Sequence, residues 1–305
     1  MPPLRFYNVI SIAIYAVALA LLYTSLPVTD IAYYLASVSL NLVPHLVKYE
    51  IKGVEFKGVR LFPCKHYMGL YSLKTGKIMI SSKAVDMPDV FLFIKYHEVG
   101  HSRQPHDLLY YVSRNLSPFA LAFHVIFTPL TNRRYRLVMR FLASLQLGLF
   151  ALQFTGPSAF IIVMPVMLIL SPIVEYLGAL LYLAALTFLL TGAVLSILFA
   201  SLTYLSTLTS FLGLPLLFYL GYTVPSLAYE TDADNYAAKM MGERVLTAYK
   251  LFIGKEPKPR EALLSPPFLL METHPLPGFE YFRLKRFVKK MKTEPKAKAC
   301  RNLQF

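Results

Sequence analysis

The stretch Tyr96-His97-Glu98-Val99-Gly100-His101-Ser102 contains two histidines four residues apart, with an acid directly after the first. On a helix, residues four apart lie on one face, about one turn from each other. Two imidazole nitrogens at this spacing can bind one zinc ion, and the neighbouring Glu98 can take a proton from water that the metal activates. The stretch therefore predicts a zinc-binding helix with His97 and His101 as ligands and Glu98 as catalytic base.

A third ligand must come from elsewhere, because a catalytic zinc site has three protein ligands and one open position. The stretch Tyr229-Glu230-Thr231-Asp232-Ala233-Asp234-Asn235 predicts a helix with acids at 230 and 234 on one face. Glu230 can bind the metal. Asp234, one turn on, can accept a hydrogen bond from a ligand histidine and so fix its tautomer. We therefore expect one Zn²⁺ per chain, held by His97, His101 and Glu230.

The residues before the histidines predict a β-hairpin and then a helix. Tyr71-Ser72-Leu73 and Lys77–Ser81 flank Lys74-Thr75-Gly76, whose glycine suits a hairpin turn. Asp86-Met87-Pro88-Asp89 is a helix start in which the first residue can act as N-cap, and the helix stops before Pro105. We expect Lys77–Ser81 to be an exposed edge strand that binds protein or peptide substrates in extended form by strand addition.

These segments together resemble the membrane gluzincin peptidases, the family that includes the heat-shock protease HtpX and the CaaX prenyl proteases. In that family a hairpin strand precedes the HExxH helix, and a later E-x-x-A-D helix, here Glu230–Asp234, supplies the third ligand. The resemblance implies a zinc-dependent endopeptidase that hydrolyses peptide bonds of unfolded or membrane-associated proteins. Thr273-His274-Pro275 is also similar to a family motif, which implies that His274 helps to hold the oxyanion. The family places an arginine soon afterwards; here Glu280 stands there and Arg283 follows.

The composition favours a membrane protein. Hydrophobic residues make up 56% of the 305 residues and charged residues only 16%, whereas soluble domains have about 25% charged residues. The net charge is +14, and the Lys and Arg residues fall at Arg5, within 48–140 and within 239–301. This distribution indicates basic cytoplasmic segments beside membrane helices. No nucleic-acid recognition motif accompanies them, so we expect the lipid bilayer of the cell membrane as a partner and no nucleic acid.

The hydrophobic runs divide the zinc domain into two parts on the cytoplasmic side. The predicted organisation is a transmembrane hairpin at 1–47, the first part of the zinc peptidase domain at 48–115, an interfacial segment at 116–140, a block of about four transmembrane helices at 141–224, the second part at 225–282 and a basic tail at 283–305. The predicted fold class is a mainly α-helical membrane protein, with transmembrane helices plus a small α+β gluzincin-type zinc peptidase domain.

Other interpretations stay open at this point. One is processing of prenylated proteins, and another is a transporter whose loops merely contain HExxH; paired intramembrane charges would favour the transporter, but Glu175 stands alone in its apolar block. An intramembrane protease of the site-two type would need the metal helix inside the bilayer, and Lys95 and Arg103 argue against that. His106 and Asp107 are interpreted as solvated loop residues, because the ligand set is already full.

Overall fold

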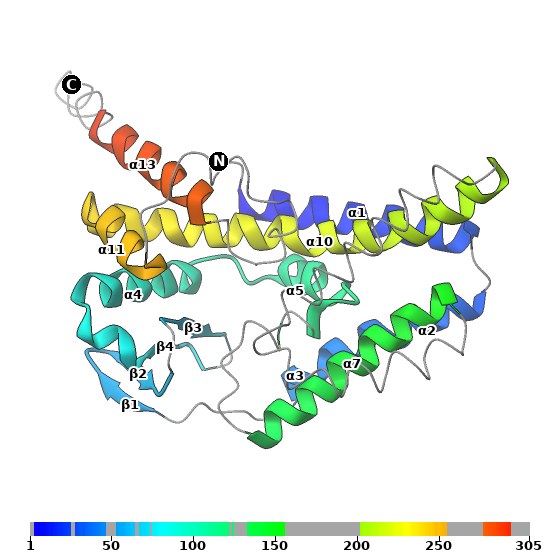
Figure 1. Ribbon diagram of the computed structural model, residues 1–305, viewed down its shortest axis with the longest axis horizontal. Coiled ribbons are helices and arrows are strands. Elements are labelled where there is room, and N and C mark those ends of the chain that lie inside the picture. Colours follow the sequence, from blue (N-terminus) through cyan, green and yellow to red (C-terminus); the bar gives the residue numbers. More distant parts are fainter. Residues whose placement is uncertain are drawn as a thin grey trace. The chain divides into compact units, whose positions relative to one another are not determined.

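The computed structural model of the chain describes residues 3–25, 28–46, 53–64, 67–73, 75–121, 124, 133–155, 202–254 and 277–293. Within these ranges the chain is mainly helical, with one four-stranded sheet (Figure 1). It divides into two compact units. The first consists of Met1–Glu50 and Pro105–Pro225, and the second of Ile51–Gln104 and Ser226–Phe305.

The sheet of the second unit has the strand order β1-β2-β4-β3. Its strands are β1 (Val54–Phe56), β2 (Val59–Phe62), β3 (Gly69–Ser72) and β4 (Lys77–Ser81). The predicted hairpin is present, since β3 and β4 pair antiparallel and Gly76 has a φ of +64° in the turn. The predicted edge position of Lys77–Ser81 is wrong, because β2 pairs in parallel with the other side of β4. Among the described strands, β3 is the one at this edge of the sheet.

Helix α4 (Pro88–Ser102) follows the sheet and carries the two histidines. Its N-cap is Met87, which makes no side-chain cap bond, so the prediction of Asp86 as N-cap is wrong. Asp86 instead ends the 3₁₀ helix η2 (Ser82–Asp86). Met87 is extended, with φ −124° and ψ 93°, because a residue before proline is pushed out of the helical region. Pro88 and Asp89 lie in the first turn of α4, as the sequence predicted.

Small residues let α4 approach the elements on both of its sides, the sheet and the end of α10 (Leu202–Met241) (Figure 1). A Cβ atom on Gly100 would lie 2.7 Å from the Cα atom of Ala233 and 3.1 Å from its carbonyl oxygen. On the sheet side, a Cβ atom on Gly69 of β3 would overlap the carboxylate of Glu98. The backbones of α4 and α10 are therefore in direct contact at Gly100.

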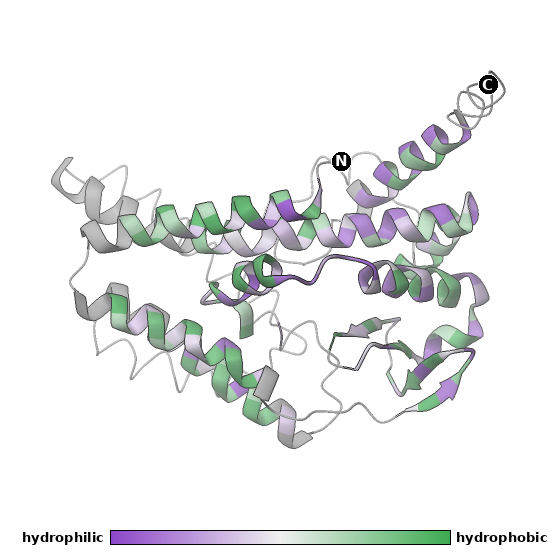
Figure 2. Cartoon of the chain, turned by 180° about the vertical axis from the view of Figure 1, so that it is seen from behind, coloured by the Kyte–Doolittle hydropathy of each residue, from purple (hydrophilic) through white to green (hydrophobic). Residues whose placement is uncertain are grey.

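The core of the second unit is formed by apolar side chains of the sheet, α4, α11 (Arg244–Ile253) and α13 (Pro277–Thr293). Phe93 of α4 packs edge-on against Tyr249 and Phe252 of α11, with ring centroids 5.6 and 5.7 Å apart. Hydrophobic and hydrophilic residues alternate along α13 (Figure 2). Its apolar face is buried in this core through Tyr281, Leu284 and Val288.

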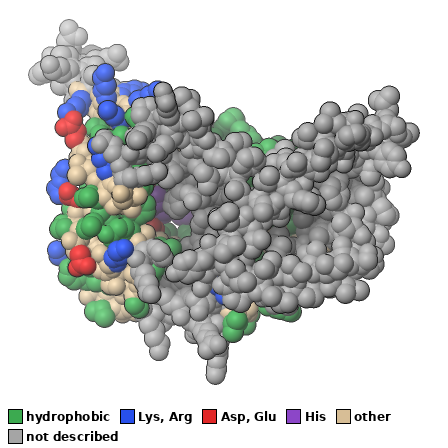
Figure 3. Space-filling view, in the orientation of Figure 1, with side chains coloured by type: hydrophobic (Ala, Val, Ile, Leu, Met, Phe, Trp, Pro, Cys, Tyr) green, Lys and Arg blue, Asp and Glu red, His purple; other side chains and the backbone are tan. Residues whose placement is uncertain are grey.

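Part of the predicted basic tail thus belongs to a packed helix, and residues 294–305 lie outside the described residues. Lys285, Arg286 and Lys289 on the other face of α13 are exposed. On the face of the molecule in Figure 3, the visible Lys and Arg side chains are interspersed with hydrophobic and acidic ones. This mixed surface is typical of a solvated face.

The first unit contains α1 (Leu4–Ser25), α2 (Val28–Ser39), η1 (Leu40–Leu42), α3 (Val43–Leu46), α5 (Leu108–Asn115), α7 (Arg133–Thr155) and the first part of α10. A buried polar network joins several of its elements. The side-chain amide of Gln146 donates to the carbonyl oxygen of Ser37 at 3.0 Å and to Oδ1 of Asn41 at 2.6 Å. It also accepts from the backbone N–H of Leu121 at 3.0 Å. Buried side chains of this unit therefore include hydrogen-bonded polar groups as well as apolar ones.

The prediction of transmembrane helices is wrong for the residues that the structure describes. No helix in these ranges is both long enough and apolar enough to cross a membrane. Helix α2 has 12 residues, about 18 Å at the usual rise, whereas a bilayer core is about 30 Å thick. Helix α7 begins inside the predicted interfacial segment, and its N-terminal half contains four arginines. Residues 156–201, the centre of the predicted transmembrane block with Glu175, lie outside the described ranges.

The contact of α4 with α10 predicts the effect of adding one methyl group. Gly100→Ala should lower the free energy of unfolding by about 1–3 kcal/mol, because the new Cβ atom would have to displace the backbone of α10. Ser102→Ala, at an exposed position of the same helix, should change it by less than about 0.5 kcal/mol. Urea denaturation of both variants measures this difference. Equal stabilities of the two variants would contradict the close contact.

Candidate metal centre

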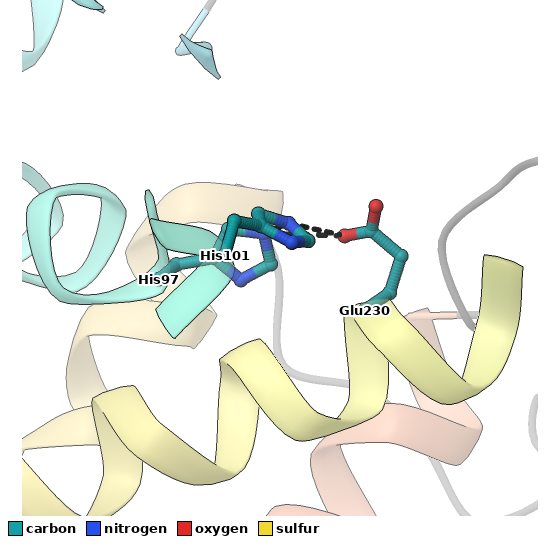
Figure 4. A group of neighbouring side chains, drawn as sticks. All are labelled: His97, His101 and Glu230. Carbon is teal, nitrogen blue, oxygen red and sulfur yellow. Dashed lines mark hydrogen bonds and ion pairs between the residues drawn. The ribbon is translucent and has the colours of Figure 1, made fainter. Parts of the chain in front are cut away.

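Two histidines of α4 and one glutamate of α10 point toward one another within the second unit (Figure 4). The Nε2 atoms of His97 and His101 are 3.1 Å apart. Oε2 of Glu230 lies 3.2 Å from Nε2 of His97 and 3.3 Å from Nε2 of His101. The structure thus brings together the three side chains that the sequence predicted as ligands, from segments more than a hundred residues apart in the chain.

The spacing of these three atoms fits a tetrahedral zinc ion. Zinc binds imidazole nitrogen and carboxylate oxygen at about 2.0–2.1 Å, which places neighbouring ligands of a tetrahedron about 3.3 Å apart. The three observed separations, 3.1, 3.2 and 3.3 Å, lie close to that value. Among the described residues, His97, His101 and Glu230 have potential ligand atoms that lie close enough together to hold one metal ion. Two histidines and one glutamate are also a known ligand set of catalytic zinc.

The other ring nitrogen of each histidine is held by an oxygen. Nδ1 of His97 lies 2.7 Å from Oδ1 of Asp234, and Nδ1 of His101 lies 2.8 Å from Oε1 of Gln104. A carboxylate or an amide oxygen only accepts hydrogen bonds, so in the neutral rings both Nδ1 atoms donate. The lone pairs of both Nε2 atoms then face Glu230, which is the arrangement that a metal ion requires.

Asp234 thus makes the contact with His97 that the sequence predicted, but Gln104 was missed. The amide nitrogen of Gln104 donates to the carbonyl oxygen of Tyr229 at 2.6 Å and approaches Oδ2 of Asp232 at 3.3 Å. Gln104 therefore ties the end of α4 to α10 as well as orienting His101. The available signal was a polar residue three positions after His101 and directly before Pro105.

Buried charges make this site favourable for a cation. Burial lowers the pKa of His97, but the charges and hydrogen bonds of Asp234 and Glu230 outweigh it and raise the pKa well above its usual value. Burial also lowers the pKa of His101, and Glu230 again reverses the effect, so the net shift is upward. Burial raises the pKa of Asp234, but the charge and the hydrogen bond of His97 oppose this effect. The net shift of the pKa is downward. The carboxylates therefore favour positive charge at the position between them.

Glu98 lies on the side of α4 that faces the sheet. Its side chain is 6% exposed and packs against Gly69 at the start of β3. Its charge acts on His101, whose pKa it helps to raise, so the carboxylate lies near the histidine pair. Glu98 is therefore buried next to the candidate metal centre and next to the edge strand.

The remaining candidate residues are placed differently. His274 lies outside the described residues. Asp107 acts as the N-cap of α5, where it accepts from the backbone N–H of Tyr110 at 3.2 Å, and it pairs with Arg5 at 2.7 Å. The ring of His106 packs edge-on against Tyr110. Asp107 is thus a helix cap in the first unit, where the sequence had suggested only a solvated loop residue.

No protein-family model, no curated protein and no solved structure matches this chain. The resemblance to the membrane gluzincin peptidases therefore rests on its motifs alone. The chemistry of the site has to be inferred from the geometry of its residues.

The raised pKa of His97 predicts that zinc binding depends on pH. Zinc must displace any proton on Nε2, so the affinity should fall as the pH falls through the raised pKa. The loss should begin at a higher pH than for an ordinary histidine site. Calorimetric titration in two buffers of different ionisation enthalpy should reveal protons released on binding. An affinity that stays constant from mildly acidic to neutral pH would contradict this electrostatic account.

The role of Gln104 predicts a specific loss of affinity. Gln104→Leu should weaken zinc binding about 10–100-fold, because Nδ1 of His101 loses the oxygen that orients the ring. Gln104→Glu keeps an acceptor for Nδ1 of His101 but loses the donor to the carbonyl oxygen of Tyr229, so its affinity should lie between those of Gln104→Leu and the unaltered chain. Competition with a chromophoric chelator measures both dissociation constants. If Gln104→Leu bound zinc as tightly as the unaltered chain, Gln104 would not support the ligand.

Proposed function

We propose that this chain is a zinc-dependent endopeptidase. The observation that carries the proposal is the combination of three convergent ligand atoms, His97 Nε2, His101 Nε2 and Glu230 Oε2, with the buried carboxylate of Glu98 beside them. Three protein ligands leave a fourth position for water or a substrate carbonyl. A buried acid next to such a position is what hydrolysis of a peptide bond requires.

The roles of the residues follow from their positions. Zinc would supply Lewis acidity, which makes water nucleophilic near neutral pH and polarises the peptide carbonyl. Glu98 accepts a proton from the attacking water as its oxygen bonds to the carbonyl carbon. When the carbon–nitrogen bond breaks, Glu98 returns that proton to the leaving amine. Asp234 and Gln104 hold the histidine rings in place throughout.

The edge strand β3 is the proposed binding position for the substrate backbone. Gly69, its first residue, lies against Glu98. A peptide that added to β3 as a further strand would therefore pass beside the catalytic carboxylate. Main-chain hydrogen bonds would provide most of the recognition. Unfolded or extended protein segments with little sequence preference are the expected substrates.

The first test separates metal binding from catalysis. The unaltered chain should bind about one zinc ion and cleave casein. Glu98→Gln should keep the metal, because Glu98 is not a ligand, and should lose at least about 10²–10⁴-fold in rate, because the amide cannot accept the proton. Glu230→Ala should lose the metal together with the activity. Metal analysis and casein cleavage of the same preparations measure both properties.

Glu243→Gln is the matched control, since this glutamate is exposed and pairs with Lys292 away from the histidines. It should keep both zinc and activity. Cleavage by Glu98→Gln at the original rate, or an unaltered chain without zinc affinity, would rule out the proposed enzyme.

A further inference from the structure

Arg283 lies on helix α13, and its guanidinium group binds two helices at once. Its Nε atom lies 2.9 and 2.7 Å from the two carboxyl oxygens of Glu280 on α13, and its Nη2 atom pairs with Oε1 of the same residue. Nη1 donates to Oδ1 of Asn235 on α10, and Nη2 approaches the carbonyl oxygen of Thr231 at 3.4 Å. The side chain of Arg283 therefore connects α13 to α10.

The direction of this guanidinium group is set by its own helix. Glu280 and Arg283 are three residues apart, which places their side chains on one helix face. These side chains are only 1% and 15% exposed. Contacts of an arginine with both oxygens of a carboxylate are charge-assisted, and the planar guanidinium group leaves its N–H groups in fixed directions. Glu280 thus directs the guanidinium group toward α10.

The contacts of Arg283 fall on the turn of α10 that carries a candidate ligand. Thr231 directly follows Glu230, and Asn235 directly follows Asp234 in the chain. In an α-helix each carbonyl oxygen accepts from the N–H group four positions on, so Thr231 and Asn235 mark the two ends of one turn. Glu230 and Asp234 have the same spacing. Both carboxylates that face the histidines are therefore on the turn that Arg283 binds.

The same turn is held on its other side by α4. A Cβ atom on Gly100 would lie 2.7 Å from the Cα atom of Ala233, so the two backbones are in direct contact. Residues two apart in an α-helix point about 200° apart around its axis. Thr231 and Asn235 therefore lie on nearly the opposite side of α10 from Ala233. Contacts on two opposite sides resist rotation of the turn about the helix axis.

We propose that Arg283 is a positioning residue of the candidate metal centre. Held by Glu280, it fixes the 230–235 turn of α10. The carboxylates of Glu230 and Asp234 then keep their positions against the histidines of α4. The proposal rests on the zinc site proposed above and deepens it, and it does not depend on which substrate the site cleaves. Helix α13 thus contributes to the affinity for zinc, although it contains none of the three candidate ligands.

The positive charge of Arg283 separates a positioning role from simple electrostatics. A cation near a zinc site repels the metal, so loss of the charge alone should tighten zinc binding. Loss of the contact with α10 should weaken it instead, because ligand atoms must be held within about 0.5 Å of the productive geometry. A role only in holding α13 would lower the stability of the protein and leave the zinc affinity of the folded chain unchanged.

The test measures zinc affinities of the full-length chain and its variants by chelator competition. Arg283→Met should weaken binding roughly tenfold. Glu280→Gln combined with Arg283→Met removes both charges of the buried pair, so the net charge stays the same and no buried carboxylate loses its partner. This double variant should weaken binding similarly, and it tests the proposal if Arg283→Met alone does not fold. The visible spectrum of the Co²⁺-loaded protein, which reports the geometry of the ligands, should change in both.

Lys285→Met and Leu284→Ala are matched controls on the same helix. Lys285 is exposed, so its replacement removes a positive charge at the surface of α13. Leu284 is fully buried in the core, so its truncation reduces the packing of α13 and should lower the thermal stability. Both controls should bind zinc as tightly as the unaltered chain and leave the cobalt spectrum unchanged.

Each result decides for or against the proposal. Unchanged or higher zinc affinity of the folded double variant would overturn the positioning role of Arg283. A loss in Leu284→Ala equal to that in Arg283→Met would overturn it as well, because packing of α13 alone would then be sufficient. If the unaltered chain binds zinc but cleaves nothing, the proposed peptidase fails and these affinities still decide the role of Arg283. If it binds no zinc, both proposals fail together.

Discussion

The candidate metal centre depends on the direct contact between the backbones of α4 and α10. The two helices contribute motifs of the same spacing, His97-x-x-Gly100-His101 and Glu230-x-x-Ala233-Asp234. Residues at i, i+3 and i+4 share one helix face, so each motif places a small residue between two functional side chains. Gly100 meets Ala233 at the contact. A larger residue at Gly100 would meet the backbone of α10, so the two helices could not keep this separation.

Charge is the second constraint on the site. Glu98, Glu230 and Asp234 are concentrated around two histidines in a buried region, and burial of charge is costly unless it is compensated. Each acid has a separate partner or position: Glu230 faces both Nε2 atoms, Asp234 faces Nδ1 of His97, and Glu98 lies toward the sheet. Protons on the histidines can balance the carboxylates, and so can a divalent cation. The geometry of the three ligand atoms, close to the edges of a zinc tetrahedron, favours the cation.

The local features of this site could be predicted from the sequence because they depend on short spacings. The histidine pair, the hairpin at Gly76 and the one-turn relation of Glu230 to Asp234 are all set within a few residues. The edge position of β4 was predicted wrongly, because its parallel pairing with β2 joins strands that are not neighbours in the sequence. For the described residues, the transmembrane helices predicted from composition and from apolar runs were wrong, because no helix there is long and apolar enough to cross a membrane. In the first unit some of those residues pack against one another, as Tyr34 does on Phe218 with ring centroids 4.9 Å apart.

Of the residues that support the histidine rings, Asp234 was predicted from the sequence and Gln104 was not. Asp234 lies one turn after Glu230 in the same helix, whereas the position of Gln104 depends on where α4 ends. Segments around 97–104 and 229–235 must therefore both be in place before the histidine rings have one orientation. Metal ligands that are preformed only in the folded chain couple metal binding to folding. A zinc ion that binds the folded state stabilises it in proportion to the logarithm of its concentration. The residues that align the site and the residues that hold the second unit together are thus partly the same.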